Sequence, residues 1–269
     1  MKKVLLSTLL TTLALGLVAP AALAVDKNTE GVIKFEPESV DDIILPETEP
    51  PIVVTPPTGS ETEEFEAGLN MTVPGLEFGT VKMKMTDAEY NPLPQVYTNK
   101  ETPATKYTLP PMAIVRDARG LAAGTGDWSL KVSAGQFKDD TKGVNLGAST
   151  LSFVKPRVFN SMRTVPGQEI TALGLANITF TKTSVNVSSG SQLILSSKDG
   201  AAVGQTTYML DEEAKYVIKN PGATGQEVTN LDANTPIKGV TLKVPGSVDK
   251  DKTATYKSVL TWTLSNTPD

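Results

Sequence analysis

Apolar and polar residues alternate in short runs through most of the chain after Gly68. Successive side chains of a strand point to opposite faces, so this alternation predicts strands rather than helices. Gly, Pro, Asn and Asp separate the runs, as is typical of turns between strands. The runs that we expect to be strands are 76–85, 112–116, 127–137, 149–159, 177–181, 191–197, 215–219, 239–245 and 255–264. Short strands at this spacing predict an all-β fold, with a single β-sandwich or barrel-like domain over residues 68–269.

The chain before residue 68 has a different pattern. Residues 1–24 combine two lysines, an apolar stretch and a final Ala-Leu-Ala, which predicts a secretory signal peptide cleaved after Ala24. Residues 25–67 contain one alternating run, 31–39, which we expect to be a short strand. The rest is an acidic linker, because residues 46–64 are rich in Pro and Glu and are expected to stay extended and to pack no core.

The charge is distributed unevenly along the chain. Residues 25–66 hold 12 acidic and 2 basic side chains, whereas residues 67–269 hold 18 acidic and 21 basic ones. A mildly basic body is compatible with an anionic cell wall but is only weak support for it. Nucleic acid is not an expected partner, since no basic stripe is interleaved with aromatic residues.

The chain lacks histidine and cysteine. Their absence removes the usual Ser-His and Cys-His nucleophilic sites and the common zinc ligands. A glycosidase would need only two carboxyl groups, but nothing marks such a pair among the acidic residues. We therefore expect no catalytic residues, no metal site and no cofactor, and a protein that is not an enzyme.

The same composition bears on where the protein is found. Secreted domains of many organisms carry disulfides, so an exported chain without cysteine suggests a Gram-positive bacterium. We expect no integral membrane segment after signal cleavage, because no second hydrophobic stretch is present. The motif Leu45–Thr48 resembles a sortase signal but is followed by Glu49 instead of Gly. The prediction is a secreted protein at the cell surface or cell wall that is held there non-covalently.

The only two tryptophans, Trp128 and Trp262, both occur in the pattern Trp-x-Leu. On a strand, Trp128 and Leu130 share one apolar face, and Trp262 and Leu264 share another. We expect these two strands to be adjacent. Their apolar faces either pack into the core or form an exposed platform on which sugar rings stack. The opposite faces are polar and supply secondary candidates for ligand contact, namely Ser129, Lys131, Thr261 and Thr263, with Ser133 beside them.

The order of motifs resembles that of WxL-domain cell-surface proteins of Gram-positive bacteria. The matching features are the signal peptide, "GVIKFEP" near the mature N-terminus, the acidic linker, "GLEFG" (75–79), "VRDARG" (115–120), "DWSLKVS" (127–133) and "YKSVLTWTLSNTP" (256–268). The resemblance implies non-covalent attachment to the bacterial surface through peptidoglycan, with Trp128, Leu130, Trp262 and Leu264 as marked residues. It also implies cooperation with WxL-interacting and sortase-anchored surface proteins.

Two functions remain open at this point. The first is a non-catalytic wall-binding protein that recognises peptidoglycan through this domain, as part of a surface complex. The alternative is a protein–protein interaction or adhesion subunit that partner proteins hold at the surface. The acidic stretch 25–66 and the value of Trp at protein interfaces favour the alternative.

Overall fold

The alternating runs fold into antiparallel sheets. The computed structural model describes residues 42–46, 48, 51–120, 126–161, 178–181, 185–211, 218–219 and 227–266, which all belong to one compact unit, 37–269. The predicted signal peptide and the expected strand within 31–39 lie outside the described residues. Within the described ranges the one helical element is a 3-10 turn, Val187–Ser189. The predicted all-β class is confirmed.

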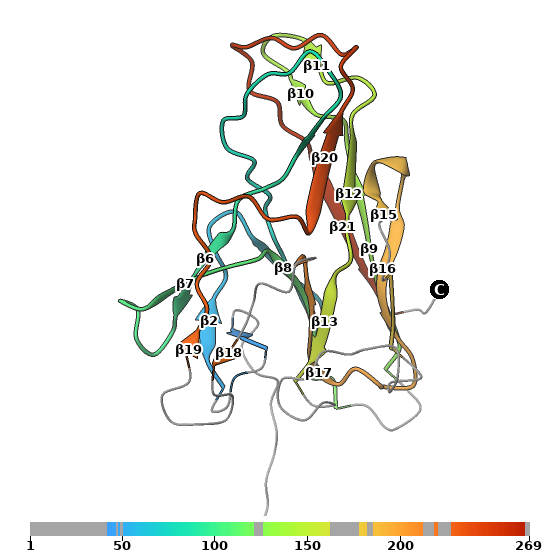
Figure 1. Ribbon diagram of the computed structural model, residues 1–269. Coiled ribbons are helices and arrows are strands. Elements are labelled where there is room, and N and C mark those ends of the chain that lie inside the picture. The colour runs from blue at the N-terminus through green and yellow to red at the C-terminus, as the bar shows by residue number, and fades with distance from the viewer. Residues whose placement is uncertain are drawn as a thin grey trace, which may run out of the picture. The chain divides into compact units, whose positions relative to one another are not determined.

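Two sheets, one of four and one of five strands, are formed mainly by the first half of the chain, and every pairing in them is antiparallel (Figure 1). The N-terminal sheet has the order β1 (Ile43–Ile44), β2 (Val53–Thr55), β6 (Gln95–Asn99), β7 (Lys106–Leu109). The five-stranded sheet has the order β13 (Arg157–Asn160), β17 (Gly204–Met209), β8 (Met112–Asp117), β4 (Leu69–Val73), β3 (Glu61–Glu66).

Two more four-stranded sheets contain the later strands. The Trp sheet has the order β14 (Ile178–Phe180), β16 (Gln192–Ser197), β9 (Trp128–Ala134), β21 (Leu260–Ser265). The β12 sheet has the order β15 (Val185–Asn186), β12 (Thr150–Phe153), β20 (Val240–Val244), β5 (Ala88–Tyr90). Two short hairpins complete the set, β10 (Lys138–Asp139) with β11 (Val144–Asn145), and β18 (Ile218–Lys219) with β19 (Glu227–Val228).

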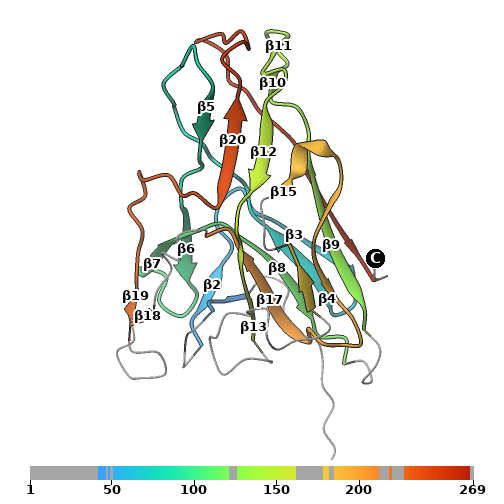
Figure 2. The same ribbon diagram turned by 45° about the vertical axis from the view of Figure 1, so that its right-hand side comes forward.

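The five-stranded sheet has an apolar cluster on each face. In strand β8, Ala113 and Val115 belong to a cluster shared with the Trp sheet and the β12 sheet. Met112 and Ile114 belong to a second cluster shared with the N-terminal sheet. Coverage on both faces explains why β8 begins with four consecutive apolar residues instead of alternating. A single two-sheet sandwich therefore does not describe the arrangement (Figure 2).

Part of the stretch expected to be a linker belongs to the second core. Val54 of β2 is fully buried, and Ile43 of β1 is 1% exposed. The side-chain amide of Gln205 acts as a strand partner for Ile44, accepting from its N–H at 2.9 Å and donating to its carbonyl at 2.6 Å. The expectation that residues 46–64 pack no core is wrong, because Val53 and Val54 inside the proline-rich run belong to β2 and Val54 is buried.

Two predicted strands differ from the structure. Residues 76–85 form no strand although Val, Lys and Met alternate there; the strand instead precedes them as β4, and residues 79–87 are exposed. The run 149–159 is two strands in two sheets, β12 and β13, divided at Lys155, whose φ is 40°. Alternation therefore located strand-forming sequence but not the points where the chain changes sheet.

Candidate functional site

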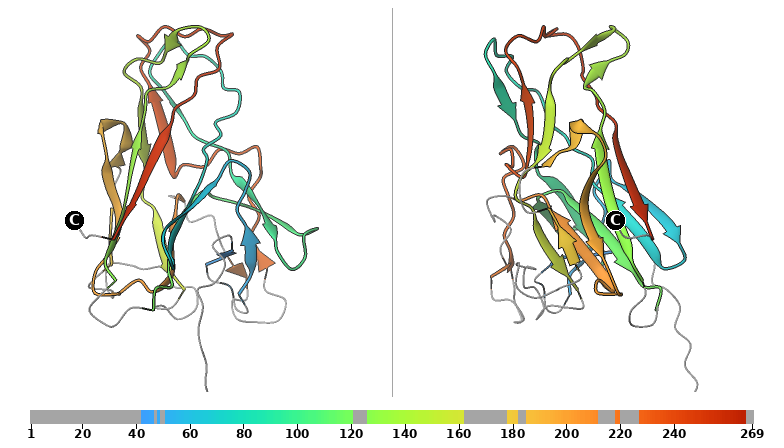
Figure 3. Two further views of the ribbon diagram at one scale, coloured as in Figure 1. Left: turned by 180° about the vertical axis from the view of Figure 1, so that it is seen from behind. Right: turned by 90° about the vertical axis from the view of Figure 1, so that its right-hand side faces the viewer.

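The two Trp-x-Leu strands pair directly, as the sequence predicts. Strand β9 lies between β16 and β21, and β21 runs antiparallel to it at the edge of the Trp sheet (Figure 3). The register places Leu130 opposite Leu264 and Val132 opposite Trp262. Cross-strand partners share a face, so both Trp-x-Leu motifs point into the same apolar cluster.

The first motif is core. Trp128, Leu130 and Val132 are each 0% exposed, and Leu264 of the second motif is 6% exposed. The indole Nε1 of Trp128 has no hydrogen-bond partner among the described residues. Trp128, Leu130 and Leu264 therefore have almost no surface to offer a ligand, and for them the structure shows the core alternative rather than the exposed platform.

Trp262 occupies a different environment, although it lies on the same face. It is partly buried, and its ring stacks on Phe153 with the centroids 5.9 Å apart and the planes 27° apart. Phe153 belongs to β12, so this contact joins the Trp sheet to the β12 sheet. Trp262 is the one member of the two motifs that combines a packing role with partial solvent exposure.

The opposite face of β9 and β21 is rich in hydroxyl groups. Thr261 and Thr263 are exposed, Lys131 is partly exposed, and Thr263 lies directly opposite Lys131. Ser133, opposite Thr261, is also partly exposed. We call this set, Lys131, Ser133, Thr261 and Thr263, the outer hydroxyl face. Ser129 shares this side of the sheet but is only 1% exposed, so the remaining secondary candidate is not accessible.

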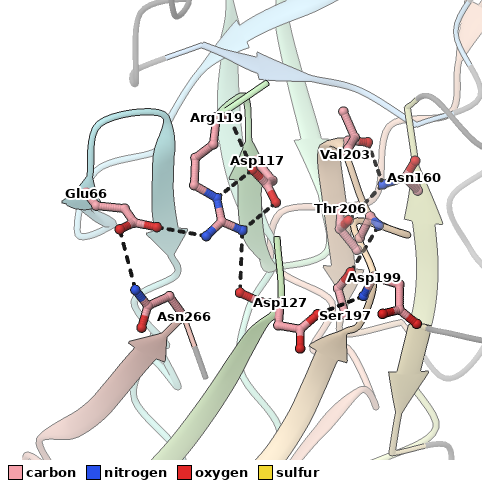
Figure 4. A network of polar contacts seen from close by, with 11 residues as sticks. Glu66, Asp117, Arg119, Asp127, Asn160, Ser197, Asp199, Val203, Thr206 and Asn266 are labelled. Carbon is pink, nitrogen blue, oxygen red and sulfur yellow. Dashed lines mark hydrogen bonds and ion pairs between the residues drawn. The ribbon is translucent and has the colours of Figure 1, made fainter. Parts of the chain in front are cut away.

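A buried ion-pair network fixes one end of the two strands (Figure 4). Arg119 donates to both carboxylate oxygens of Asp117, at 2.9 Å from Nε and 2.7 Å from Nη2. Its Nη1 lies 2.7 Å from Glu66 Oε1. The Arg119 and Asp117 side chains are only 7% and 4% exposed, and hydrogen bonding to Asp117 raises the pKa of Arg119. A bidentate pair of this kind holds its partners in a fixed geometry.

The network reaches both Trp-x-Leu strands. Arg119 Nη2 donates to the carbonyl of Asp127, immediately before β9, at 3.4 Å. Asn266, immediately after β21, donates to Glu66 at 3.5 Å. Arg119 and Asp117 come from "VRDARG", which the sequence marked without a structural role. Glu66 carried no signal beyond lying in an acidic run, so sequence reasoning missed it.

A second group of polar contacts, which we call the Asp139 clamp, lies at the other end of the same strand pair. Asp139 of β10 accepts hydrogen bonds from the Thr141 hydroxyl at 2.6 Å and from the Thr255 N–H at 2.8 Å. The Thr141 hydroxyl and the Thr255 N–H, in that order, lower the pKa of Asp139. Lys138 and Lys257 form an isolated antiparallel bridge beside it. The segment that leads into β21 is thereby tied to the hairpin that follows β9.

Three further features of the described residues concern metal binding, membrane insertion and the carboxyl groups with lowered pKa. No group of three His, Cys, Asp or Glu side chains there is placed to hold a metal ion. In the same ranges no helix has the length and apolar character needed to cross a membrane. The carboxyl groups with lowered pKa, Asp139, Asp232 and Asp251, accept bonds mainly from their own turns. Asp232 and Asp251 stabilise their own turns, and Asp139 in addition holds Thr255.

Comparison with known proteins gives one match. A family model described as "WxL domain surface cell wall-binding" matches residues 22–268, nearly the whole chain. No curated protein and no solved structure matches the chain. The match extends over both Trp-x-Leu strands, the "VRDARG" segment and the acidic stretch that precedes β4.

Proposed function

The chain belongs to the WxL family of cell wall-binding surface domains, and from this premise we propose that it binds peptidoglycan through the outer hydroxyl face. The observation that carries the proposal is the orientation of the two motifs. Trp128, Leu130 and Leu264 are turned into the core. The residues that alternate with them, Thr261 and Thr263, are exposed on the other side of the same two strands.

The chemistry of this face suits a wall polymer. Peptidoglycan presents sugar hydroxyls, amides and the carboxylates of its peptide stems. Threonine and serine hydroxyls both donate and accept hydrogen bonds, so they can pair with the first two groups. Lys131, opposite Thr263, supplies the cation of this face and would pair with a carboxylate. Adjacent strands are about 4.8 Å apart, so the face offers a regular row of polar groups to an extended chain.

Sedimentation with purified sacculi tests the proposal. The mature protein should pellet with sacculi from which proteins and other polymers have been removed. Replacing Thr261 and Thr263 by Val removes two hydroxyls at nearly constant shape and should weaken binding about tenfold, while Lys131→Gln should weaken it further. Each hydroxyl or charged contact contributes on the order of 1 kcal/mol, and 1.4 kcal/mol is a factor of ten.

A matched control is available in the turn between β6 and β7. Thr102 and Thr105 are exposed there and make no side-chain hydrogen bond to described residues. The double change of Thr102 and Thr105 to Val should leave sedimentation unchanged. If the variant with Thr261 and Thr263 changed to Val and the variant Lys131→Gln both bound the wall fully, the outer hydroxyl face would be refuted as the site. Failure of the unaltered protein to sediment would refute direct peptidoglycan binding altogether.

We further propose that the protein is exported by a Gram-positive bacterium, is not an enzyme, and acts within a surface complex. The predicted signal peptide supports export, and the absence of histidine and cysteine from the sequence supports a non-catalytic role. WxL-interacting and sortase-anchored proteins are the partners implied by resemblance. If partners alone held the protein at the surface, as in an adhesion subunit, removal of all protein from the sacculi would abolish sedimentation.

A further inference from the structure

A seven-residue segment carries apolar and basic side chains that are left uncovered. This Lys-Met segment, residues 80–86, contains Val81, Met83 and Met85, which are 47%, 51% and 80% exposed. Lys82 and Lys84 alternate with them and are also exposed. Within the described ranges neither lysine has an ion-pair partner. Exposed apolar side chains in such a row are uncommon on a free surface and mark a contact site.

The backbone of the Lys-Met segment is also unpaired. No backbone hydrogen bond joins residues 80–86 to the backbone of another residue in the described ranges. Its main chain accepts one hydrogen bond from a described residue, from the hydroxyl of Tyr90 to the carbonyl of Lys82 at 3.1 Å. At its C-terminal end the backbone of Met85 and Thr86 packs closely against Gly246. The segment has the side-chain alternation of a strand but is not paired as one in the described ranges, so the N–H and C=O groups of residues 81–84, apart from the Lys82 carbonyl, are available to a partner.

The acidic edge strand β3 has the opposite character. It pairs with β4 along one side and is the last strand in the order of the five-stranded sheet. Glu61 and Glu63 are exposed and, in the described part of the structure, have no ion-pair partner. Phe65, at the bulge near the end of the strand, is 45% exposed. An edge lined by glutamate repels an acidic strand and is complementary to a basic one.

The two features match in period and in charge. Glu61 and Glu63 are two residues apart, as are Lys82 and Lys84, so both sets lie on one face of an extended strand. We propose that the Lys-Met segment of one copy adds as a sixth strand to the β3 edge of a second copy of this chain. Backbone hydrogen bonds supply the affinity, and the two Glu–Lys pairs supply the selectivity.

The interface is of the heterologous type, because the segment and the edge are different surfaces of the same chain. A heterologous contact that does not close into a ring repeats from one molecule to the next and forms an open filament. Such a filament would bring many wall-binding domains together, so that their weak individual contacts with the wall act jointly. The association is expected in solution, in the absence of cell wall.

Sedimentation-velocity centrifugation of the mature protein over a range of concentrations tests the association. At low salt the weight-average mass should rise with concentration, and it should fall as salt is added, since exposed charge pairs are screened. The variant K82E/K84E and the variant E61K/E63K should each associate at least tenfold more weakly. The variant that carries all four changes restores opposite charges and should recover the association.

A control with the same change of charge uses Lys198→Glu and Lys252→Glu, two exposed lysines outside both features, and should associate normally.

Hydrogen–deuterium exchange then locates the contact. Amides of residues 61–66 and 80–86 in the unaltered protein should become protected together at high concentration. Neither K82E/K84E nor E61K/E63K alone should show this protection. A protein that stays monomeric at every concentration overturns the proposal. Association that survives both charge reversals, or that protects other segments, also overturns it.

Discussion

The two Trp-x-Leu motifs have the same three-residue pattern and point to the same face, yet they differ in environment. Trp128 lies on a strand with a neighbour on each side and is fully buried. Trp262 lies on the edge strand, is partly exposed, and stacks on Phe153 of another sheet. The difference shows that the position of a strand in its sheet decides what the motif does. One copy fills the core, and the other closes the boundary between two sheets.

Replacing Trp128 by Ala should have the largest effect. The ring is fully buried, and a cavity of this size costs about 3–5 kcal/mol of unfolding free energy. Urea unfolding followed by circular dichroism measures the loss. A change of less than about 1 kcal/mol would mean that Trp128 is not a core residue in solution, and the contrast between the two motifs would disappear.

Replacing Arg119 by Met should cost about 3 kcal/mol. The change leaves the Asp117 carboxylate buried without its bidentate partner, which is strongly destabilising even though the intact pair contributes little net stability. The same urea experiment applies, and Glu66→Gln is the control, because Glu66 is more exposed and should cost less. If both variants were equally mild, the network would not be what holds the ends of the two motifs together.

Replacing Trp262 by Ala should cost about 1–2 kcal/mol. The partial burial of the ring and one aromatic pair of about 0.5–1.5 kcal/mol are lost, but no sealed cavity forms, because the site is open to solvent on one side. Two single-tryptophan variants compare the solvent exposure of the two rings directly. Acrylamide should quench the fluorescence of Trp262 in W128F more strongly than that of Trp128 in W262F. Equal quenching would contradict the difference in exposure.

The smallest expected effect is the response of the strand pair to acid. Because its pKa in the folded protein is lowered, Asp139 stabilises the fold above the pKa of an unfolded Asp, about 3.9, and this contribution is lost as the pH falls through the lowered value. Asp139→Asn should lower the melting temperature slightly at pH 7 and flatten its decline below about pH 4. An unchanged pH profile would remove Asp139 from the clamp.

Much of this site follows from a period of two along the sequence. Alternation in 128–134 and 260–264 predicts two adjacent amphipathic strands, each with its Trp on the apolar face, and the structure confirms the strands and their adjacency. The sequence does not reveal which strand is central, because that depends on β16, which joins β9 from a distant part of the chain. Long-range pairing of this kind leaves no local signal.

The errors have the same origin. Val54 lies among prolines and glutamates, and its complete burial depends on a cluster shared with Tyr97, Met112 and Met209. The segment 80–85 has a strand-like alternation but finds no strand beside it among the described residues. Local composition gives the tendency of a segment, and the availability of a partner strand decides whether that tendency is realised.

The pairing of β9 with β21 also has a consequence for how the chain matures. Strand β9 is complete at Ala134, whereas its edge partner begins only at Leu260. A chain that emerges from its N-terminus must therefore hold one side of the β9 backbone open until the last described strand arrives. Such non-local closure is slow and leaves an edge exposed to other chains. Until β21 pairs, the edge of β9 in the Trp sheet stays open to pairing with other chains, so the last described strand is what removes this aggregation-prone edge.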